Sequence, residues 1–163
     1  MQKAELNDLY DQWLQPIYRY VLSRVKHVDD AKDITSQTFL SAWKNHERYQ
    51  ERGEFAAWLF SIARNKINDH FRQIRRRNNQ IQVPGNEDIY KVYAEPQNET
   101  LIALRQVIST LSEKEQELIR LRYVAGLDFA TIAKISHRSP AACRKACSRL
   151  VAKLKAHFDI EQE

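Results

Sequence analysis

The feature that most constrains this chain is the helical spacing of apolar residues between positions 54 and 77, EFAAWLFSIARNKINDHFRQIRRR. Apolar side chains recur there every three or four residues, at Phe55, Trp58, Leu59, Ile62, Ala63, Ile67, Phe71 and Ile74. A stripe with this period is the buried face of an amphipathic α-helix. At about 100° per residue, the opposite face collects Ser61, Arg64, Asn65, Asn68, Arg72 and Arg75. The segment therefore predicts a long helix with one buried face and one polar face.

The polar face of this predicted helix has residue types that bind nucleic acid. From Arg64 to Arg77 there are six basic residues and one acidic residue. Arginine neutralises phosphate, asparagine reads base edges, and an aromatic such as Trp58, at the edge of the apolar stripe, stacks on an unpaired base. A solvated basic face over core aromatics would give the same pattern. The helix alone leaves both interpretations open.

The rest of the chain repeats the helical period. Apolar residues at this spacing run from Leu6 to Val25, and Pro16 is expected to kink that segment or to start a second helix. Asp29 is expected to cap a helix that ends near Asn45. Its predicted inward side chains are Ile34, Phe39, Leu40, Ala42 and Trp43. Since only three glycines occur, each between periodic segments, the sequence predicts an all-α fold rather than a hairpin-rich β fold.

Charge and composition divide the chain into two small helical domains and a connector. Residues 1–77 carry 14 basic and 10 acidic side chains, and residues 98–163 carry 11 and 8. Between them, residues 78–97 carry one lysine and three acids. Pro84, Gly85 and Pro96 interrupt the helical period there, which predicts a flexible linker. Two basic blocks beside an acidic connector indicate a polyanionic partner that is contacted at two places.

Signals at helix ends mark out the elements of the C-terminal domain. Ser112 followed by Glu115 is a capping-box pattern. Gly126 is placed to end that helix in a left-handed conformation, and Asp128 is placed to cap the next, short helix.

The last predicted helix opens with Ser139 as its cap and Pro140 as its first residue. Cys143, Ala146, Cys147, Leu150, Val151 and Leu154 form its predicted buried face. From Arg138 to Lys155 there are six basic residues and no acidic one. A short helix, a tight turn and a basic second helix describe a helix-turn-helix, whose second helix would lie in the major groove of DNA.

Three segments give the chain its resemblance to the bacterial sigma-70 family, in the extracytoplasmic-function (ECF) group. They are DDAKDITSQTFLSAW at 29–43, FAAWLFSIARNKINDHFR at 55–72 and LSEKEQELIRLRYVAGLDFATIAKISHRSPAACRK at 111–145, in the order and spacing of the family's two conserved domains. The resemblance implies a region 2-like helical domain at 1–77, a linker at 78–97 and a region 4-like helix-turn-helix domain at 98–163. It also implies a sigma factor that binds core RNA polymerase, recognises promoter DNA and starts transcription.

The resemblance further implies three contact surfaces. In members of the family, the segment that corresponds to residues 29–43 docks on a coiled coil of the polymerase largest subunit. By position this implicates Asp33, Ile34, Ser36, Gln37 and Phe39. The family segment that corresponds to residues 49–76 opens the minus-ten element and reads it as single-stranded DNA. By position this implicates Tyr49, Arg52, Trp58, Arg64, Asn65, Asn68, Arg72, Arg75 and Arg76. The helix-turn-helix reads the minus-thirty-five element as duplex, which implicates Arg138, Ser139, Ala141, Ala142, Arg144, Lys145, Ser148 and Arg149.

Several positions depart from the family pattern. Ser36-Gln37 stands where Gln-Glu is usual, so one acidic docking contact is missing. His137 stands where a turn glycine is common, and histidine is among the residues that tolerate a positive φ at some cost. Ala142 and Ala146 stand where threonine and a basic residue are frequent, so the promoter sequence preference of the family is not carried over.

Other classes of function are less consistent with the sequence. Phosphate-binding glycine loops, a nucleophile elbow and metal-spaced clusters are lacking, so we expect no enzyme activity, no cofactor and no metal. Cys143 and Cys147 occupy core positions of a helix and fit a reducing cytoplasm. The sequence contains no run of about 18 apolar residues, so we expect no membrane-spanning helix. We expect an anti-sigma factor as a further partner. An autonomous helix-turn-helix regulator is the alternative, which leaves the Arg/Asn/Trp face at 58–76 unexplained.

Overall fold

The repeating apolar residues form seven α-helices and two short helical turns in the computed structural model, which describes residues 3–49, 55–80 and 99–160. Within those ranges no strand occurs, which confirms the all-α prediction. The chain divides into two units, Met1–Tyr93 and Ala94–Glu163.

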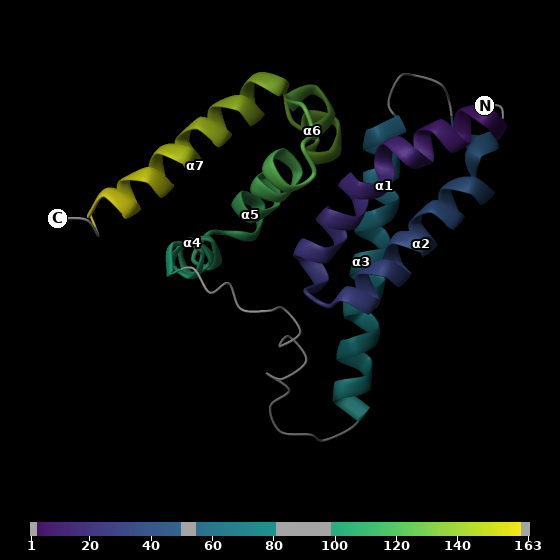
Figure 1. Ribbon diagram of the computed structural model, residues 1–163, viewed down its shortest axis with the longest axis horizontal. Helices are drawn as coiled ribbons and strands as arrows, with labels where there is room; N and C mark the ends of the chain where they lie inside the picture. Colours follow the sequence, from purple (N-terminus) through teal and green to yellow (C-terminus); the bar gives the residue numbers. More distant parts are fainter. Residues whose placement is uncertain (1–2, 50–54, 81–98, 161–163) are drawn as a thin grey trace. The chain divides into compact units, whose positions relative to one another are not determined.

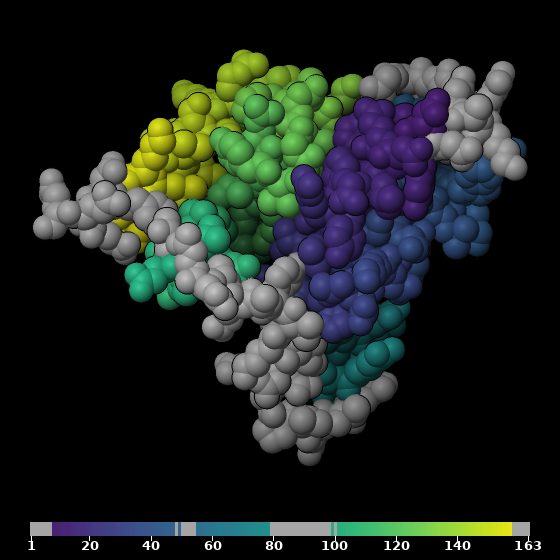
Figure 2. All heavy atoms as spheres, viewed as in Figure 1, coloured from purple at the N-terminus to yellow at the C-terminus, as the bar shows by residue number. Residues whose placement is uncertain are grey.

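The N-terminal unit is a three-helix bundle. It contains α1 (Lys3–Val25), α2 (Val28–Lys44), the 3-10 turn η1 (His46–Arg48) and α3 (Phe55–Gln80). The three long helices lie side by side, and each packs on the other two (Figure 1). In the space-filling view α1 and α2 lie directly against each other (Figure 2). All three helices contribute fully buried side chains, and the largest come from α1 and α3: Ile17, Tyr20, Leu59, Phe60 and Ile67.

The junction between α1 and α2 differs from the prediction. Lys26 takes a left-handed conformation with φ 56°, and His27 then caps α2 with an extended backbone, its Nδ1 accepting a hydrogen bond from the Asp30 N–H at 3.4 Å. The prediction that Asp29 is the cap was therefore wrong by two residues. Asp29 lies in the first turn instead, where the helix dipole favours its charge.

α1 continues as one helix through Pro16, so of the two outcomes expected there the start of a second helix is ruled out. One helix boundary departs from expectation. α3 continues to Gln80, three residues into the predicted linker. Asn78, Asn79 and Gln80 lack apolar periodicity but contain no helix breaker, so the hydrogen-bond ladder extends through them. The rest of the linker lies outside the described residues.

The C-terminal unit consists of shorter helices that lead into one long helix. They are α4 (Glu99–Ser109), α5 (Glu113–Ile119), a π-helical turn η3 (Arg120–Val124), α6 (Phe129–Ser136) and α7 (Pro140–Ile160). Within this unit α7 packs on α5 and α6 (Figure 1). The predicted helix that begins after Ser112 is thus α-helical only as far as Ile119.

The predicted caps of this unit are confirmed. Ser112 and Glu115 form the reciprocal capping box. Gly126 has a φ of 73°. Asp128 Oδ1 accepts a hydrogen bond from the Thr131 N–H at 2.7 Å, and Ser139 Oγ accepts one from the Ala142 N–H at 3.1 Å. These bonds satisfy N–H groups that otherwise lack a partner in the first turn of each helix.

His137 ends α6 in the left-handed region, with φ 53° and ψ 45°. We expect His137→Gly to raise the free energy of unfolding of this unit by about 0.5–1 kcal/mol, because loss of Cβ relieves left-handed strain and the freer unfolded glycine offsets part of the gain. Urea unfolding of the full chain, followed by segment-resolved hydrogen exchange, measures it. His137→Ala, which keeps Cβ, should show no such gain. Ala130→Gly, an exposed change within α6, should cost about 1 kcal/mol. A stabilisation by both alanine and glycine would contradict the strain argument.

Asp128 makes the stability of this unit depend on pH. The pKa of its carboxyl is lowered, chiefly because the Thr131 backbone N–H donates to the carboxylate. A pKa lowered by folding adds stability that is present above the unfolded value of about 3.9 and is lost as pH falls through the folded value. We therefore expect Asp128→Asn, which keeps a capping oxygen, to reduce the loss of stability between about pH 5 and pH 2. Asp128→Ala should cost about 1 kcal/mol at pH 7. Urea unfolding across this pH range is the measurement, and an unchanged pH dependence in Asp128→Asn would refute the assignment.

Candidate nucleic-acid and polymerase interfaces

α3 separates a buried face from the polar face that the sequence predicts. Leu59, Ala63 and Ile67 are buried against the other helices. On the polar face, Ser61, Asn65, Asn68, Arg72 and Arg75 are exposed and Arg64 is half-buried. The predicted exposure of this face is confirmed, and its role in DNA binding stays a prediction.

An aromatic cluster of Tyr49, Phe55 and Trp58 lies at the start of α3. The Tyr49 ring centroid is 5.0 Å from that of Trp58, with 31° between the planes, and 5.6 Å from that of Phe55. All three side chains are half-buried. The rings hold one another in place and still present part of their surface to solvent, an arrangement in which an unpaired base can stack. The sequence placed Phe55 in the core and gave no signal for this contact.

The predicted minus-ten residues do not all lie together. Trp58 and Asn65 are two helical turns apart on α3. Arg75 and Arg76 are exposed near its other end, about 25 Å from Trp58 along the helix axis. They lie too far away to contact a base stacked on Trp58, and their charge would suit phosphates farther along a bound strand. Arg52 lies outside the described residues.

One charge on the polar face is already paired. Arg72 Nη1 lies 3.1 Å from Asp69 Oδ1, and both side chains are more than half exposed. An exposed ion pair of this kind contributes little to stability and breaks readily. Arg72 can therefore exchange the carboxylate for a phosphate.

The predicted polymerase-docking residues lie on two sides of α2. Asp33, Ser36 and Gln37 are exposed, and Gln37 Nε2 donates to Asp33 Oδ2 at 2.8 Å. Ile34 is buried, so it packs in the core beneath this surface and cannot itself contact a partner. Phe39 is half-buried, with its ring 4.7 Å from the Tyr10 ring of α1.

The structure corrects the predicted inward positions of Leu40 and Trp43. Their side chains are 53% and 42% exposed, because α2 buries the stripe of Ala31, Ile34, Thr35, Thr38 and Ala42 instead. Steps of three and four residues place Leu40 and Trp43 on the same helix face as Asp33, Ser36 and Gln37. We call these five residues the docking face. Large exposed apolar side chains among polar ones are typical of a protein-binding surface.

α6 and α7 form the predicted helix-turn-helix, joined by the turn His137–Ser139. Ile132 and Ile135 of α6 and Cys143, Cys147 and Leu150 of α7 are buried. Of the predicted duplex-reading residues, Arg138, Ser139, Ala141, Arg144, Lys145, Ser148 and Arg149 are exposed and Ala142 is half-buried. The hydroxyl of Ser139 caps α7, so this residue has a structural role in the helix-turn-helix whether or not it contacts DNA.

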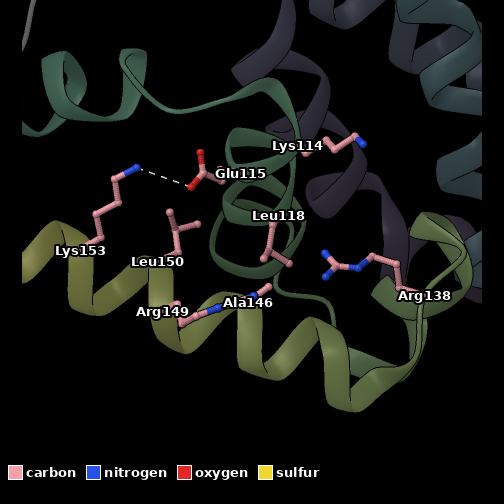
Figure 3. A pocket seen from close by; sticks show the side chains of 8 residues that line it. All are labelled: Lys114, Glu115, Leu118, Arg138, Ala146, Arg149, Leu150 and Lys153. Atoms are coloured by element: carbon pink, nitrogen blue, oxygen red, sulfur yellow. Dashed lines mark ion pairs between the residues drawn. The ribbon is translucent and has the colours of Figure 1, made fainter.

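A pocket of about 330 Å³ lies between α5 and α7 (Figure 3). Four basic side chains and Glu115 surround a floor of Leu118, Ala146 and Leu150; the basic ones are Lys114, Arg138, Arg149 and Lys153. Lys153 Nζ lies 3.6 Å from Glu115 Oε1. The pKa of the Glu115 carboxyl is lowered, chiefly because the Ser112 hydroxyl donates a hydrogen bond to the carboxylate. Arg138 and Arg149 are among the predicted DNA contacts. Lys114 and Lys153 are not, because no sequence pattern indicates that α5 and α7 lie together.

Both cysteines are buried, as their positions in the helical pattern predicted, and no disulfide joins them. Cys147 Sγ lies 3.4 Å from the Tyr123 hydroxyl, and Cys143 Sγ lies 3.9 Å from Ser136 Oγ. Among the described residues, no group of three histidine, cysteine or acidic side chains is placed to hold a metal ion. The helices in those ranges also include none with the length and apolar character needed to cross a membrane.

Comparisons with known proteins match both units. A family model described as Sigma-70 region 2 matches residues 9–77, and one described as Sigma-70, region 4 matches residues 101–154. The ECF RNA polymerase sigma factor BldN of Streptomyces coelicolor is 34% identical over 154 residues, which cover 90% of this chain and 57% of BldN. The ECF RNA polymerase sigma factor SigL of Mycobacterium tuberculosis is 31% identical over 138 residues, which cover 81% of this chain and 76% of SigL.

A solved structure has the same fold. It is the sigma factor RpoE in complex with the anti-sigma factor NepR from Bartonella quintana, with a TM-score of 0.68 and 21% sequence identity. The match covers 96% of this chain and 98% of that one.

Proposed function

This chain belongs to the sigma-70 family, as an ECF RNA polymerase sigma factor that directs promoter recognition and transcription initiation, and from this premise we propose how its surfaces divide that work. The N-terminal domain, residues 1–77, binds core polymerase and captures the opened minus-ten strand. The C-terminal domain, residues 98–163, reads the minus-thirty-five element as duplex, and residues 78–97 link the two.

The observation that carries the minus-ten assignment is the pairing of the aromatic cluster with the polar face of α3. A partly exposed Trp58 lies two turns from the exposed amide of Asn65, with Asn68 and Arg72 beyond it. Stacking on an aromatic contributes about 1–3 kcal/mol per base. A flipped base on Trp58, with amides along the next turns, offsets part of the cost of melting the duplex.

The docking face of α2 is the proposed contact with core polymerase. Leu40 and Trp43 supply apolar area, and Asp33 and Gln37 supply polar contacts beside it. A central apolar anchor with a polar rim is the usual composition of such an interface. Since polymerase and chromosome share the cytoplasm of a bacterium, we place the protein there.

An anti-sigma factor is the proposed inhibitory partner. Family membership supports it, and the exposed apolar side chains of the docking face offer a surface for such a partner to cover. A partner of this kind should block run-off transcription and should bind a Leu40→Asp variant less tightly. A partner that binds tightly and leaves transcription unchanged would contradict the proposal.

The test is run-off transcription with the purified chain and bacterial core polymerase on a promoter library, with permanganate probing of unpaired thymines. We expect specific starts and reactive thymines near them. Duplex binding without polymerase association and without starts would instead favour an autonomous helix-turn-helix regulator.

A further inference from the structure

The ring of Phe129, the first residue of α6, contacts a basic side chain of the recognition helix α7. The Arg144 guanidinium carbon lies over this ring, 5.5 Å from its centroid. We propose that Phe129 is a positioning residue that sets the direction in which Arg144 meets promoter DNA. This inference rests on the proposed function, in which the C-terminal domain reads the minus-thirty-five element, with Arg144 among the predicted contacts.

The backbone that carries the ring is held in place by the cap of its own helix. Phe129 follows directly after Asp128, whose carboxylate caps α6 through the Thr131 N–H. The Phe129 side chain is half-buried, whereas that of Arg144 is exposed. A half-buried ring at a capped helix start is more constrained than an exposed arginine side chain, so we take the ring to position the guanidinium.

A second arginine ties the same ring to the turn before α6. The Arg122 guanidinium carbon lies 4.7 Å from the Phe129 centroid, and Arg122 Nη1 donates to the Leu127 carbonyl at 2.9 Å. Arg122 belongs to the π-helical turn η3, where the chain leaves regular α-helix. The π-helical turn and α7 therefore meet at one aromatic side chain, and Arg122 also ties that turn to the loop before α6.

This arrangement reduces the freedom that Arg144 must lose when it binds. An exposed arginine has many rotamers, and ordering them opposes binding. A guanidinium over an aromatic face is attracted by the ring quadrupole, and it keeps its N–H donors at the ring edge free for phosphate or base. Arg144 is thus held near one direction before DNA arrives.

The test is a double-mutant cycle in the polymerase holoenzyme, with binding measured on a promoter chosen by the transcription assay above. Phe129→Leu removes the π face and should weaken promoter binding about two- to fivefold. Phe129→Tyr keeps that face and should restore it. In an Arg144→Ala background, Phe129→Leu should have no further effect. An equal loss from Phe129→Leu in both backgrounds would overturn the proposal.

A readout specific to positioning accompanies the affinity. Phe129→Leu should flatten the preference for the same base pairs or phosphate positions that Arg144→Ala affects. A uniform loss across promoter variants would indicate a merely structural role and would overturn the inference. Because leucine could also disturb folding, fluorinated phenylalanines at position 129, which keep the ring shape and weaken its π face, should lower binding step by step. Unchanged binding across that series would likewise overturn it.

Failure of the proposed function gives a different result. If Arg144 lies outside the DNA interface, Arg144→Ala holoenzyme binds the promoter like wild type, and the cycle has no interaction for Phe129 to modulate. If Arg144 does contact DNA but Phe129 does not position it, Arg144→Ala weakens binding and Phe129→Leu leaves it unchanged.

Discussion

Phe60→Ala is expected to destabilise the N-terminal unit by about 3–5 kcal/mol, the usual cost of removing a fully buried phenylalanine. Phe60 has 0% exposure, and its ring centroid lies 5.2 Å from that of Tyr20 and 6.2 Å from that of Trp13 on α1. A unit of this size has roughly 5–12 kcal/mol of stability in all, so the loss is a large share of it. Urea unfolding followed by tryptophan fluorescence is the measurement, because all three tryptophans, at positions 13, 43 and 58, belong to this unit.

Two controls make this experiment a test of the division into units. Ser61→Ala, at the neighbouring exposed position, should change stability by less than about 0.5 kcal/mol. Hydrogen exchange in α5, α6 and α7 should stay unchanged in Phe60→Ala, because those helices have their own core. If their protection falls together with that of α1 and α3, the chain unfolds as one cooperative body.

The sequence alone predicted best what depends on neighbouring residues. The capping box of Ser112 and Glu115, the left-handed Gly126 and the Asp128 cap all involve atoms within a few positions of one another. Their geometry follows from local chain stereochemistry, whatever the helix later packs against. The confirmed helix-turn-helix rests on these signals.

Sequence reasoning failed where packing decides. α2 carries apolar residues on more than one face, so periodicity could not tell which face α1 and α3 would cover, and Leu40 and Trp43 were assigned inward. Phe60 was missed for the same reason: α3 packs on two helices, and its buried face is wider than a single stripe. The His27 cap depends on the left-handed turn at Lys26, for which the sequence has no glycine signal.

The candidate sites show the same division. The polar face of α3 could be derived from angles alone, because one helix sets it. Contacts that join separate elements could not be derived: Tyr49 against Trp58, Phe129 against Arg144, and Glu115 against Lys153. Each of these depends on how two helices or a turn and a helix meet.

Trp58→Ala is expected to reduce promoter opening about 5- to 150-fold, the equivalent of one lost base stack of about 1–3 kcal/mol. The loss extends beyond one side chain, because the Tyr49 ring packs 5.0 Å from that of Trp58 and loses its support. Binding to core polymerase should change less than about twofold, since Trp58 belongs to α3 and is not one of the five residues of the docking face on α2. Permanganate reactivity of the minus-ten thymines measures opening, and a core-binding titration measures association. Trp58→Phe should retain much of the activity.

Trp43→Ala is the matched control, because it removes a second tryptophan of the same unit that belongs to the docking face and not to the aromatic cluster. Trp43 is 42% exposed on the docking face, so its loss should weaken association with core polymerase. Once enough protein is added to saturate polymerase, opening by Trp43→Ala should approach that of wild type, whereas Trp58→Ala should stay defective. The two tryptophans thus separate recruitment from melting. If both variants lose association and opening in equal measure, α2 and α3 do not carry separate tasks, and the assignment of the aromatic cluster to the unpaired strand fails.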